Sequence, residues 1–150
     1  MNVIIRSATM SDIDSMVILL GQLFSIEEDF TADVLKQKKG LELLLQNQNY
    51  SKVLVAESDG KVVGMLTAQI YISTAEGAKA GMLEDMIIDK NYRRKGIGRM
   101  LIQKMEDWAF ENNIKRLQLL CDKNNIPALE YYKKLNWITT QLICLRKYPK

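Results

Sequence analysis

Histidine is absent from this sequence of 150 residues, and cysteine is scarce. Without histidine there is no Ser-His-Asp triad, no histidine-ligated metal and no histidine general base. The two cysteines, Cys121 and Cys144, lie far apart in apolar segments without CxxC spacing, so we expect reduced thiols and no zinc site. Acid–base chemistry must therefore come from Glu, Asp, Tyr, Cys, Lys or a chain terminus.

Long apolar runs, targeting signals and linkers are also missing. No run approaches the roughly 18 to 20 residues that a membrane span requires, and the opening MNVIIRSATM has no signal-peptide pattern. We therefore expect a cytoplasmic protein without a membrane partner. The chain has no internal repeat and no Pro/Gly-rich linker, and its length is sufficient to bury a core. Residues 1–150 are predicted to form a single domain.

The charge is only mildly basic. A net charge of +3 at pH 7 favours an anionic ligand but is far below the charge of a typical nucleic-acid binder. A nucleic-acid binder would also need more basic residues on one face and exposed aromatic side chains. This class remains a minor alternative.

Hydrophobic periodicity predicts an α/β fold with the element order βααβββαβαβ. We expect a mixed sheet with helices on both faces, in which the strand–helix–strand unit of residues 82–121 forms a parallel pair with a right-handed crossover. The predicted elements are strand 3–8, a helix capped by Thr9 with Asp12, a helix opened by Thr31 and Asp33, two strands within 52–73 joined by a turn at 58–60, strand 82–88, a helix from Ile97, strand 115–121, a helix from Asn125 and strand 137–147.

The stretch RRKGIG, residues 93–98, is the clearest ligand signal. A helix that begins at a glycine-bearing turn offers unpaired N–H groups and a partial positive charge, which suit a phosphate. Gly96 and Gly98 allow the backbone to approach the ligand closely, and the three preceding cations add donors. We predict a pyrophosphate ligand, although a solvated basic turn explains these residues equally well when they are taken alone.

Two common nucleotide fingerprints do not fit this turn. A GxGxxG motif would need glycine at Leu101, and no GxxxxGK[ST] motif occurs in the chain. The sequence therefore disfavours NAD and ATP as ligands.

Three segments resemble the GNAT superfamily of N-acetyltransferases. RRKGIG is similar to its R/Q-x-x-G-x-G/A motif, NNIPALEYYKKLNW at 124–137 is similar to its N-x-x-A-x-x-F/Y-Y-x-K-x-G-F/W segment, and the opening IIRSATMSDID is typical of it. The chain departs from the family at Arg94 and Asn136, which stand where many members have glycine. Asn tolerates that position if its φ is positive. The resemblance implies the GNAT fold, a mixed and mostly antiparallel sheet with a splayed parallel pair.

The resemblance also implies acetyl-CoA as the cofactor. In this family the backbone amides of the turn hold the pyrophosphate, the preceding strand pairs with the pantetheine arm, and a residue at the start of the last helix contacts the cofactor from the far side. Carried over, the cofactor-binding residues are Met86, Ile87, Ile88, Arg93, Arg94, Lys95, Gly96, Ile97, Gly98, Arg99, Asn125, Ala128 and Tyr131.

Transfer to an amine requires both a base and an acid. An alkylamine with a pKa near ~10.4 is almost wholly protonated at pH 7, so a general base is useful, and the departing thiolate benefits from a proton donor. By resemblance, Tyr132 matches the tyrosine that protonates the thiolate, and Glu84 is the first choice for the base. Each has a plainer interpretation: Tyr132 as a core residue, and Glu84 as a surface carboxylate.

The acceptor and the assembly are less constrained. Glu27, Glu28 and Asp29 lie in the region that shapes the acceptor pocket in the family, and they would attract a cationic amine, although a solvated turn is an equal alternative. Only one predicted strand follows the last helix, where many members of the family have a two-strand hairpin, so we expect an exposed sheet edge and a homodimer. A non-catalytic acyl-CoA-binding module is the main alternative function.

Overall fold

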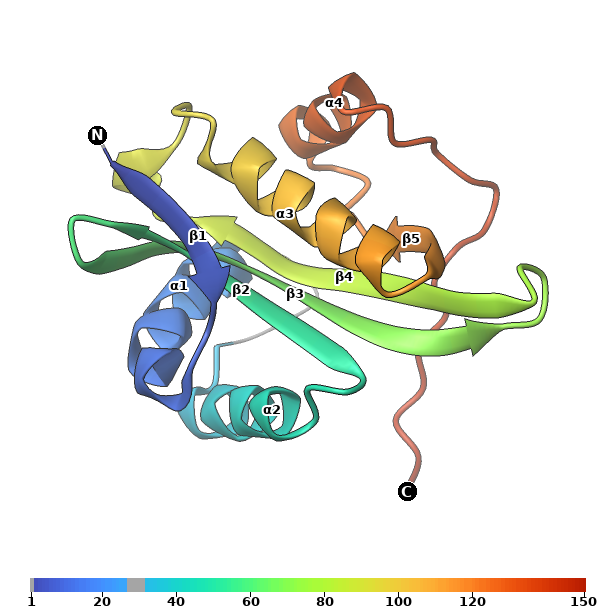
Figure 1. Cartoon of the computed structure of the whole chain (residues 1–150), viewed down its shortest axis with the longest axis horizontal. Coiled ribbons are helices and arrows are strands. Elements are labelled where there is room, and N and C mark those ends of the chain that lie inside the picture. The colour runs from blue at the N-terminus through green and yellow to red at the C-terminus, as the bar shows by residue number, and fades with distance from the viewer. Residues whose placement is uncertain (1, 27–31) are drawn as a thin grey trace. The chain divides into compact units, whose positions relative to one another are not determined.

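The computed structural model describes residues 2–26 and 32–150, and the chain divides into two compact units, Met1–Gln118 and Leu119–Lys150, each described by itself (Figure 1). The first unit holds a sheet with strand order β1-β2-β3-β4-β5. The described elements are β1 (Val3–Ser7), the 3-10 turn η1 (Met10–Asp12), α1 (Ile13–Ile26), α2 (Val34–Gln46), β2 (Ser51–Ser58), β3 (Lys61–Ser73), β4 (Ala78–Ile88), the 3-10 turn η2 (Lys90–Tyr92), α3 (Ile97–Glu111), β5 (Ile114–Leu119) and α4 (Ile126–Lys134).

The sheet is mixed, as the sequence predicts. The pairs β1–β2, β2–β3 and β3–β4 are antiparallel, and β5 lies beside β4, from which it is reached through α3. The β4–β5 pair therefore accounts for the mixed character. The predicted hairpin turn is confirmed: Asp59 and Gly60 have φ of 51° and 78°, the left-handed pair that two-residue hairpin loops require.

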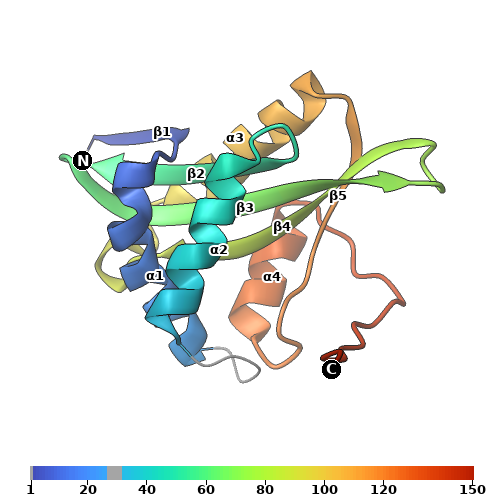
Figure 2. The same ribbon diagram turned by 90° about the horizontal axis from the view of Figure 1, so that it is seen from below.

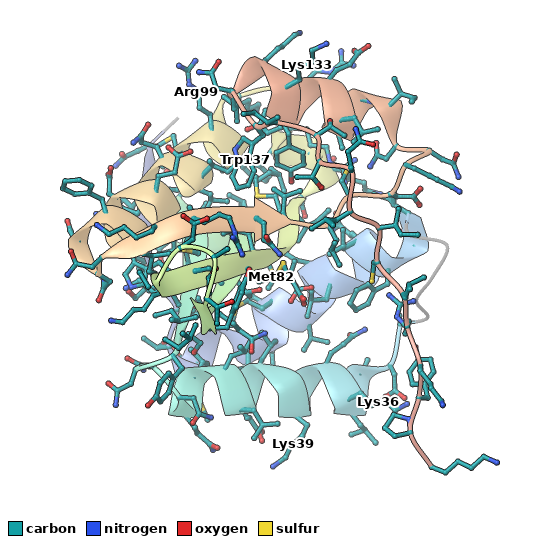
Figure 3. All side chains as sticks on the ribbon, turned by 90° about the vertical axis from the view of Figure 1, so that its right-hand side faces the viewer. Lys36, Lys39, Met82, Arg99, Lys133 and Trp137 are labelled. Atoms are coloured by element: carbon teal, nitrogen blue, oxygen red, sulfur yellow. The ribbon has the colours of Figure 1, made fainter. Side chains whose placement is uncertain are left out.

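Helices cover both faces of the first unit's sheet. α1 and α2 pack on one face and α3 packs on the other (Figures 1 and 2). The α1–α2 side buries a cluster that includes Met16, Leu41 and Met65. On the outer side of α2, Lys36 and Lys39 project away from the sheet (Figure 3). α2 therefore buries Leu41 and Leu45 and exposes lysines, the amphipathic arrangement that helical spacing predicts.

An ion-pair network fastens the first strand to its neighbours. The Arg6 guanidinium donates to both carboxylate oxygens of Asp12, at 2.8 and 2.9 Å, and to Glu57 Oε1 at 3.1 Å. Asp12 also accepts from the backbone N–H of Thr9 at 2.8 Å, so the predicted capping box is present. The Arg6 hydrogen bonds hold the pKa of the buried Asp12 carboxyl below its ordinary value.

The structure differs from the predicted order after α4, because the expected strand 137–147 does not form. The apolar side chains of this segment beyond Trp137 are exposed, with Ile138 at 87% and Leu145 at 86%. Leu142 N–H donates to the Thr140 hydroxyl at 3.3 Å, a local turn that competes with strand pairing. A segment with strand-forming residues becomes a strand only where a neighbouring strand pairs with its backbone.

Within the described part of the chain, no helix has the length and apolar character needed to cross a membrane.

Candidate cofactor site

A left-handed glycine joins the cationic turn to α3. Gly96 is the N-cap of α3 with φ of 80°, a conformation that strongly favours glycine. A Cβ placed on Gly96 would meet no heavy atom within 4 Å, so the space beside this backbone is open. The first amides of α3 follow directly, and helix geometry leaves the first four N–H groups without an intrahelical acceptor. This end of α3 can therefore receive an anion at close range.

The turn's cations are exposed, and two of them are held by local contacts. Arg93 Nε donates to the carbonyl oxygen of Ile88 at 3.0 Å, which fastens this guanidinium to the end of β4. Lys95 Nζ lies 5.4 Å from the centre of the Tyr92 ring. Arg94 has φ of 62°, so it occupies a left-handed position where glycine is favoured. The positive charge of the turn is thus partly pre-oriented before any ligand arrives.

Sequence reasoning missed one cation at this turn. Lys61, the first residue of β3, places its Nζ 5.7 Å from the centre of the same Tyr92 ring. It lies more than thirty positions before the motif, and nothing in the local pattern distinguishes it from an ordinary hairpin lysine. The fold brings it to the turn because the β2–β3 hairpin ends beside β4.

Asp89 organises the turn before the cations. Its Oδ1 accepts from the backbone N–H of Asn91 at 2.9 Å, and its Oδ2 accepts from Gln22 Nε2 at 3.2 Å. The Asn91 hydrogen bond, assisted by Gln22 and by the charges of Lys61 and Lys90, holds the pKa of Asp89 below its ordinary value. The carboxylate therefore stays ionised at neutral pH and acts as a fixed acceptor.

A bulge interrupts β4 next to Glu84. Register partners change from Thr67↔Glu84 to Met65↔Ile87, so β4 carries one residue more than β3 across this interval. Asp85 has φ of 52° there, and the buried Thr67 hydroxyl contacts its Oδ2 at 3.4 Å and donates to the Glu84 carbonyl at 3.1 Å. Bulges bend a strand and re-aim its side chains. Glu84 is exposed at the last paired position before this bend.

The second unit contains the predicted cofactor-binding and catalytic residues that lie on or beside α4. Asn125 is the N-cap, and its Oδ1 accepts from Ala128 N–H at 3.2 Å. The helix ends in a Schellman motif. Trp137 N–H donates to the carbonyl oxygen of Tyr132 at 3.0 Å, and Asn136 N–H donates to that of Lys133 at 3.0 Å. Asn136 has φ of 70°, so the condition under which asparagine tolerates this glycine-replacing position is met.

Tyr132 lies within an aromatic group of the second unit. Its ring packs edge-on against Trp137, with ring centres 6.0 Å apart, and against Tyr131 at 5.6 Å. The Trp137 ring lies beside α4 (Figure 3). Tyr132 is half-buried, so its ring is held while part of the side chain reaches solvent.

The predicted site residues thus fall into three sets. β4, the turn and the start of α3 bring together one continuous set, Glu84, Met86, Ile87, Ile88 and Arg93 to Arg99. The α4 set, Asn125, Ala128, Tyr131 and Tyr132, belongs to the other unit. Glu27, Glu28 and Asp29 lie outside the described residues.

Comparison with known proteins gives matches to one family. The sequence model of the Acetyltransferase (GNAT) family matches residues 20–137. An uncharacterized N-acetyltransferase of Archaeoglobus fulgidus is 28% identical over 129 residues, covering 85% of this chain and 88% of that protein. The aminoglycoside N(6')-acetyltransferase type 1 of Acinetobacter haemolyticus is 35% identical over 99 residues, covering 64% of this chain and 68% of that enzyme.

Solved structures show the same fold. The crystal structure of a possible acetyltransferase from Clostridium difficile 630 superposes with a TM-score of 0.87 at 26% identity, over 99% of this chain and 98% of that one. The family match covers most of the chain and includes the cationic turn, the start of α3 and α4. This protein belongs to the GNAT family of acetyltransferases.

Proposed function

We propose that this chain is an N-acetyltransferase that moves an acetyl group from acetyl-CoA directly to a primary amine. The observation that supports it most is the turn before α3. Gly96 is left-handed with open space where a Cβ would lie, and it is preceded by three exposed cations. A pyrophosphate fits such a turn, because backbone amides and cations can approach its oxygens together. The residues present therefore fit the nucleotide half of acetyl-CoA.

The thioester of acetyl-CoA, when bound, supplies an activated acetyl group. In our proposal the amides from Arg94 to Arg99 hold the pyrophosphate, and the strand Met86–Ile88 orients the pantetheine arm. Glu84 accepts a proton from the amine, directly or through water, and its exposure on β4 gives it access to water. The Tyr132 hydroxyl gives its proton to the departing sulfur. Asn125, Ala128 and Tyr131 contribute further cofactor contacts from α4.

The acceptor we propose is a small molecule or peptide that carries a primary amine. The similarity to an aminoglycoside acetyltransferase supports an amine acceptor, and amino sugars are a natural first class to screen. Glu27, Glu28 and Asp29 would attract a cationic acceptor. Polyamines, amino acids and peptide N-termini belong in the same screen.

A comparison of ligands by thermal shift tests the cofactor assignment. Wild-type protein is heated with CoA, acetyl-CoA, NAD, ATP or an oligonucleotide at equal concentration. We expect CoA and acetyl-CoA to raise the melting temperature and the others to leave it nearly unchanged, because a ligand that binds only the native state stabilises it. Stabilisation by the oligonucleotide alone would favour a nucleic-acid binder. Stabilisation by CoA without thiol release in an amine screen would favour a non-catalytic acyl-CoA-binding module.

We also propose that the chain works as one domain and as a homodimer. The family match crosses the junction between the two compact units, which supports a single functional domain. The exposed apolar side chains after α4 support self-association, since a monomer would leave them in water. Light scattering that gave a mass near the 17.2 kDa monomer at micromolar concentration would contradict the dimer.

The location that we propose is the cytoplasm. Cys121 and Cys144 are free thiols in the described chain, which is compatible with a reducing compartment.

A further inference from the structure

We propose that Gln22 of α1 is a positioning residue that clamps the start of the cationic turn and thereby sets the affinity for CoA. The inference rests on the proposed function, and it adds a residue that belongs to no sequence motif. Gln22 lies near the end of α1, 67 positions before the residue that it holds. It does not belong to the group of cations and glycines that would contact the cofactor.

The Gln22 amide uses both of its ends on consecutive residues of the turn. Its Nε2 donates to Asp89 Oδ2 at 3.2 Å, and its Oε1 accepts from the backbone N–H of Lys90 at 3.3 Å. One hydrogen bond holds a side chain and the other holds the backbone. The pair therefore fixes both the position and the orientation of this peptide relative to α1.

Asp89 transmits this restraint to the rest of the turn. Its backbone N–H donates to Val63 O at 2.8 Å, its Oδ1 accepts from Asn91 N–H at 2.9 Å, and its carbonyl accepts from Tyr92 N–H at 2.8 Å. Asp89 is thus the N-cap of η2 and is bonded to β3 and α1 as well. If Gln22 is removed, one carboxylate oxygen and one backbone N–H lose their partner at the residue where η2 begins.

Only a neutral amide satisfies both neighbours at neutral pH. The oxygen of Gln22 faces a donor and its nitrogen faces a carboxylate, so a glutamate here would place two negative charges together. Lys61 and Lys90 are the cations that act on Asp89, and neither hydrogen-bonds to it among the described contacts. A protonated glutamate would restore the pattern, because its O–H donates and its C=O accepts.

The consequence for binding follows from pre-organisation. A turn that is already ordered loses little conformational freedom when a ligand binds, whereas a loosened turn must be ordered at that moment. The loss should affect the nucleotide half of CoA, which the turn holds. A short acetyl thioester without the nucleotide should therefore be insensitive to Gln22.

The test compares Gln22→Ala and Gln22→Glu with the control Gln103→Ala, which removes an exposed amide of α3 that contacts only Asp107 among the described hydrogen bonds. At neutral pH, hydrogen exchange of the ligand-free proteins should show faster exchange of the Lys90 and Asn91 amides in both Gln22 variants and no change in Gln103→Ala. Calorimetry should show CoA binding weakened about tenfold, from two lost hydrogen bonds of modest net strength. The KM for acetyl-CoA should rise by a similar factor with kcat nearly unchanged, and use of acetyl-pantetheine should not change.

The glutamate variant adds a signature that a general loss of packing cannot produce. In Gln22→Glu, CoA affinity relative to wild type should recover as the pH falls from about 8 towards 5.5, where one proton is shared by the two carboxyls. Equal amide exchange and equal CoA affinity in Gln22→Ala and Gln103→Ala would overturn the clamp. If the wild type binds no CoA, the proposed function fails, and the exchange measurement still decides whether Gln22 clamps the turn.

Discussion

Replacement of Gly96 by valine tests the phosphate seat, because this glycine combines a left-handed backbone with open space. The structure predicts two separate costs. A β-branched residue at φ of 80° carries a local strain of roughly 1–2 kcal/mol. A side chain would also fill the space through which a phosphate reaches the first amides of α3.

The two costs differ in size and in the assay that reports them. A strain of that size lowers the melting temperature by about 2–8 °C for a protein of this length. Loss of two charge-assisted hydrogen bonds to phosphate, each about 1.5–3 kcal/mol, weakens CoA binding at least ~100-fold. Calorimetric titration with CoA at a temperature where the variant is fully folded measures the second cost alone.

Gly77 provides a matched control. It has φ of 62° in the β3–β4 hairpin, and a Cβ there also meets nothing within 4 Å. Gly77→Val should therefore lose similar stability while it binds CoA like the wild type. If Gly96→Val and Gly77→Val bound CoA equally well, the phosphate seat would have to lie elsewhere.

Four further substitutions have distinct expected outcomes. Tyr132→Phe should reduce turnover ~10²-fold with little change in CoA affinity. Glu84→Gln should lose activity mainly at neutral pH and recover activity as the pH approaches the pKa of the amine. Full turnover in either variant, with chemistry rate-limiting, would exclude the role of that residue as general acid or general base. Arg94→Gly should raise stability by about 1 kcal/mol, since φ is 62°, yet weaken CoA binding if the guanidinium contacts phosphate. Asp12→Ala should cost about 2 kcal/mol in denaturant melts at pH 7. The lowered pKa of Asp12 means that wild type loses this advantage as the pH falls below about 4, so the two proteins should converge in acid.

Substitutions of Asn136 test how much its left-handed backbone conformation affects the stability of the C-terminal end of α4. Its φ of 70° and its place in the Schellman motif predict that glycine stabilises α4 while alanine destabilises it, each by roughly 1 kcal/mol. Urea melts of both variants give the sign directly. Destabilisation by glycine would show that the asparagine side chain contributes more than its backbone conformation costs.

Local sequence patterns predicted most of the fold, because turns and helix caps depend on interactions between residues that are close in the sequence. Asp59 and Gly60 form the expected hairpin turn, and the Thr9–Asp12 capping box is present. The failed strand after α4 shows the limit of this reasoning. Its apolar and β-branched residues describe a segment that could pair. A strand also needs a neighbouring strand with free backbone groups, and the residues of the segment alone do not show whether such a neighbour exists.

The site shows the same division between local and distant information. Gly96 and its cations stand together in the sequence, so their spacing indicates a candidate ligand turn, and the resemblance to the GNAT family favours this interpretation over a solvated basic turn. Gln22 and Lys61 reach the turn only through the packing of α1 and the β2–β3 hairpin, and neither stands in a recognisable motif. The bulge at Asp85 could not be predicted from the sequence either, because the extra residue of β4 is recognised only from its pairing register with β3.

The central claim is tested most directly by following the acetyl group itself. Acetyl-CoA labelled with deuterium in the acetyl methyl is incubated with the protein and a panel of amino sugars, aminoglycosides, polyamines, amino acids and peptides, and the products are analysed by mass spectrometry. We predict labelled acetyl on an amine nitrogen of at least one acceptor, CoA released in equal amount, and much less of both products with Gly96→Val at sub-saturating acetyl-CoA. Tight CoA binding with no labelled amide from any acceptor would contradict the account and favour a non-catalytic acyl-CoA-binding protein.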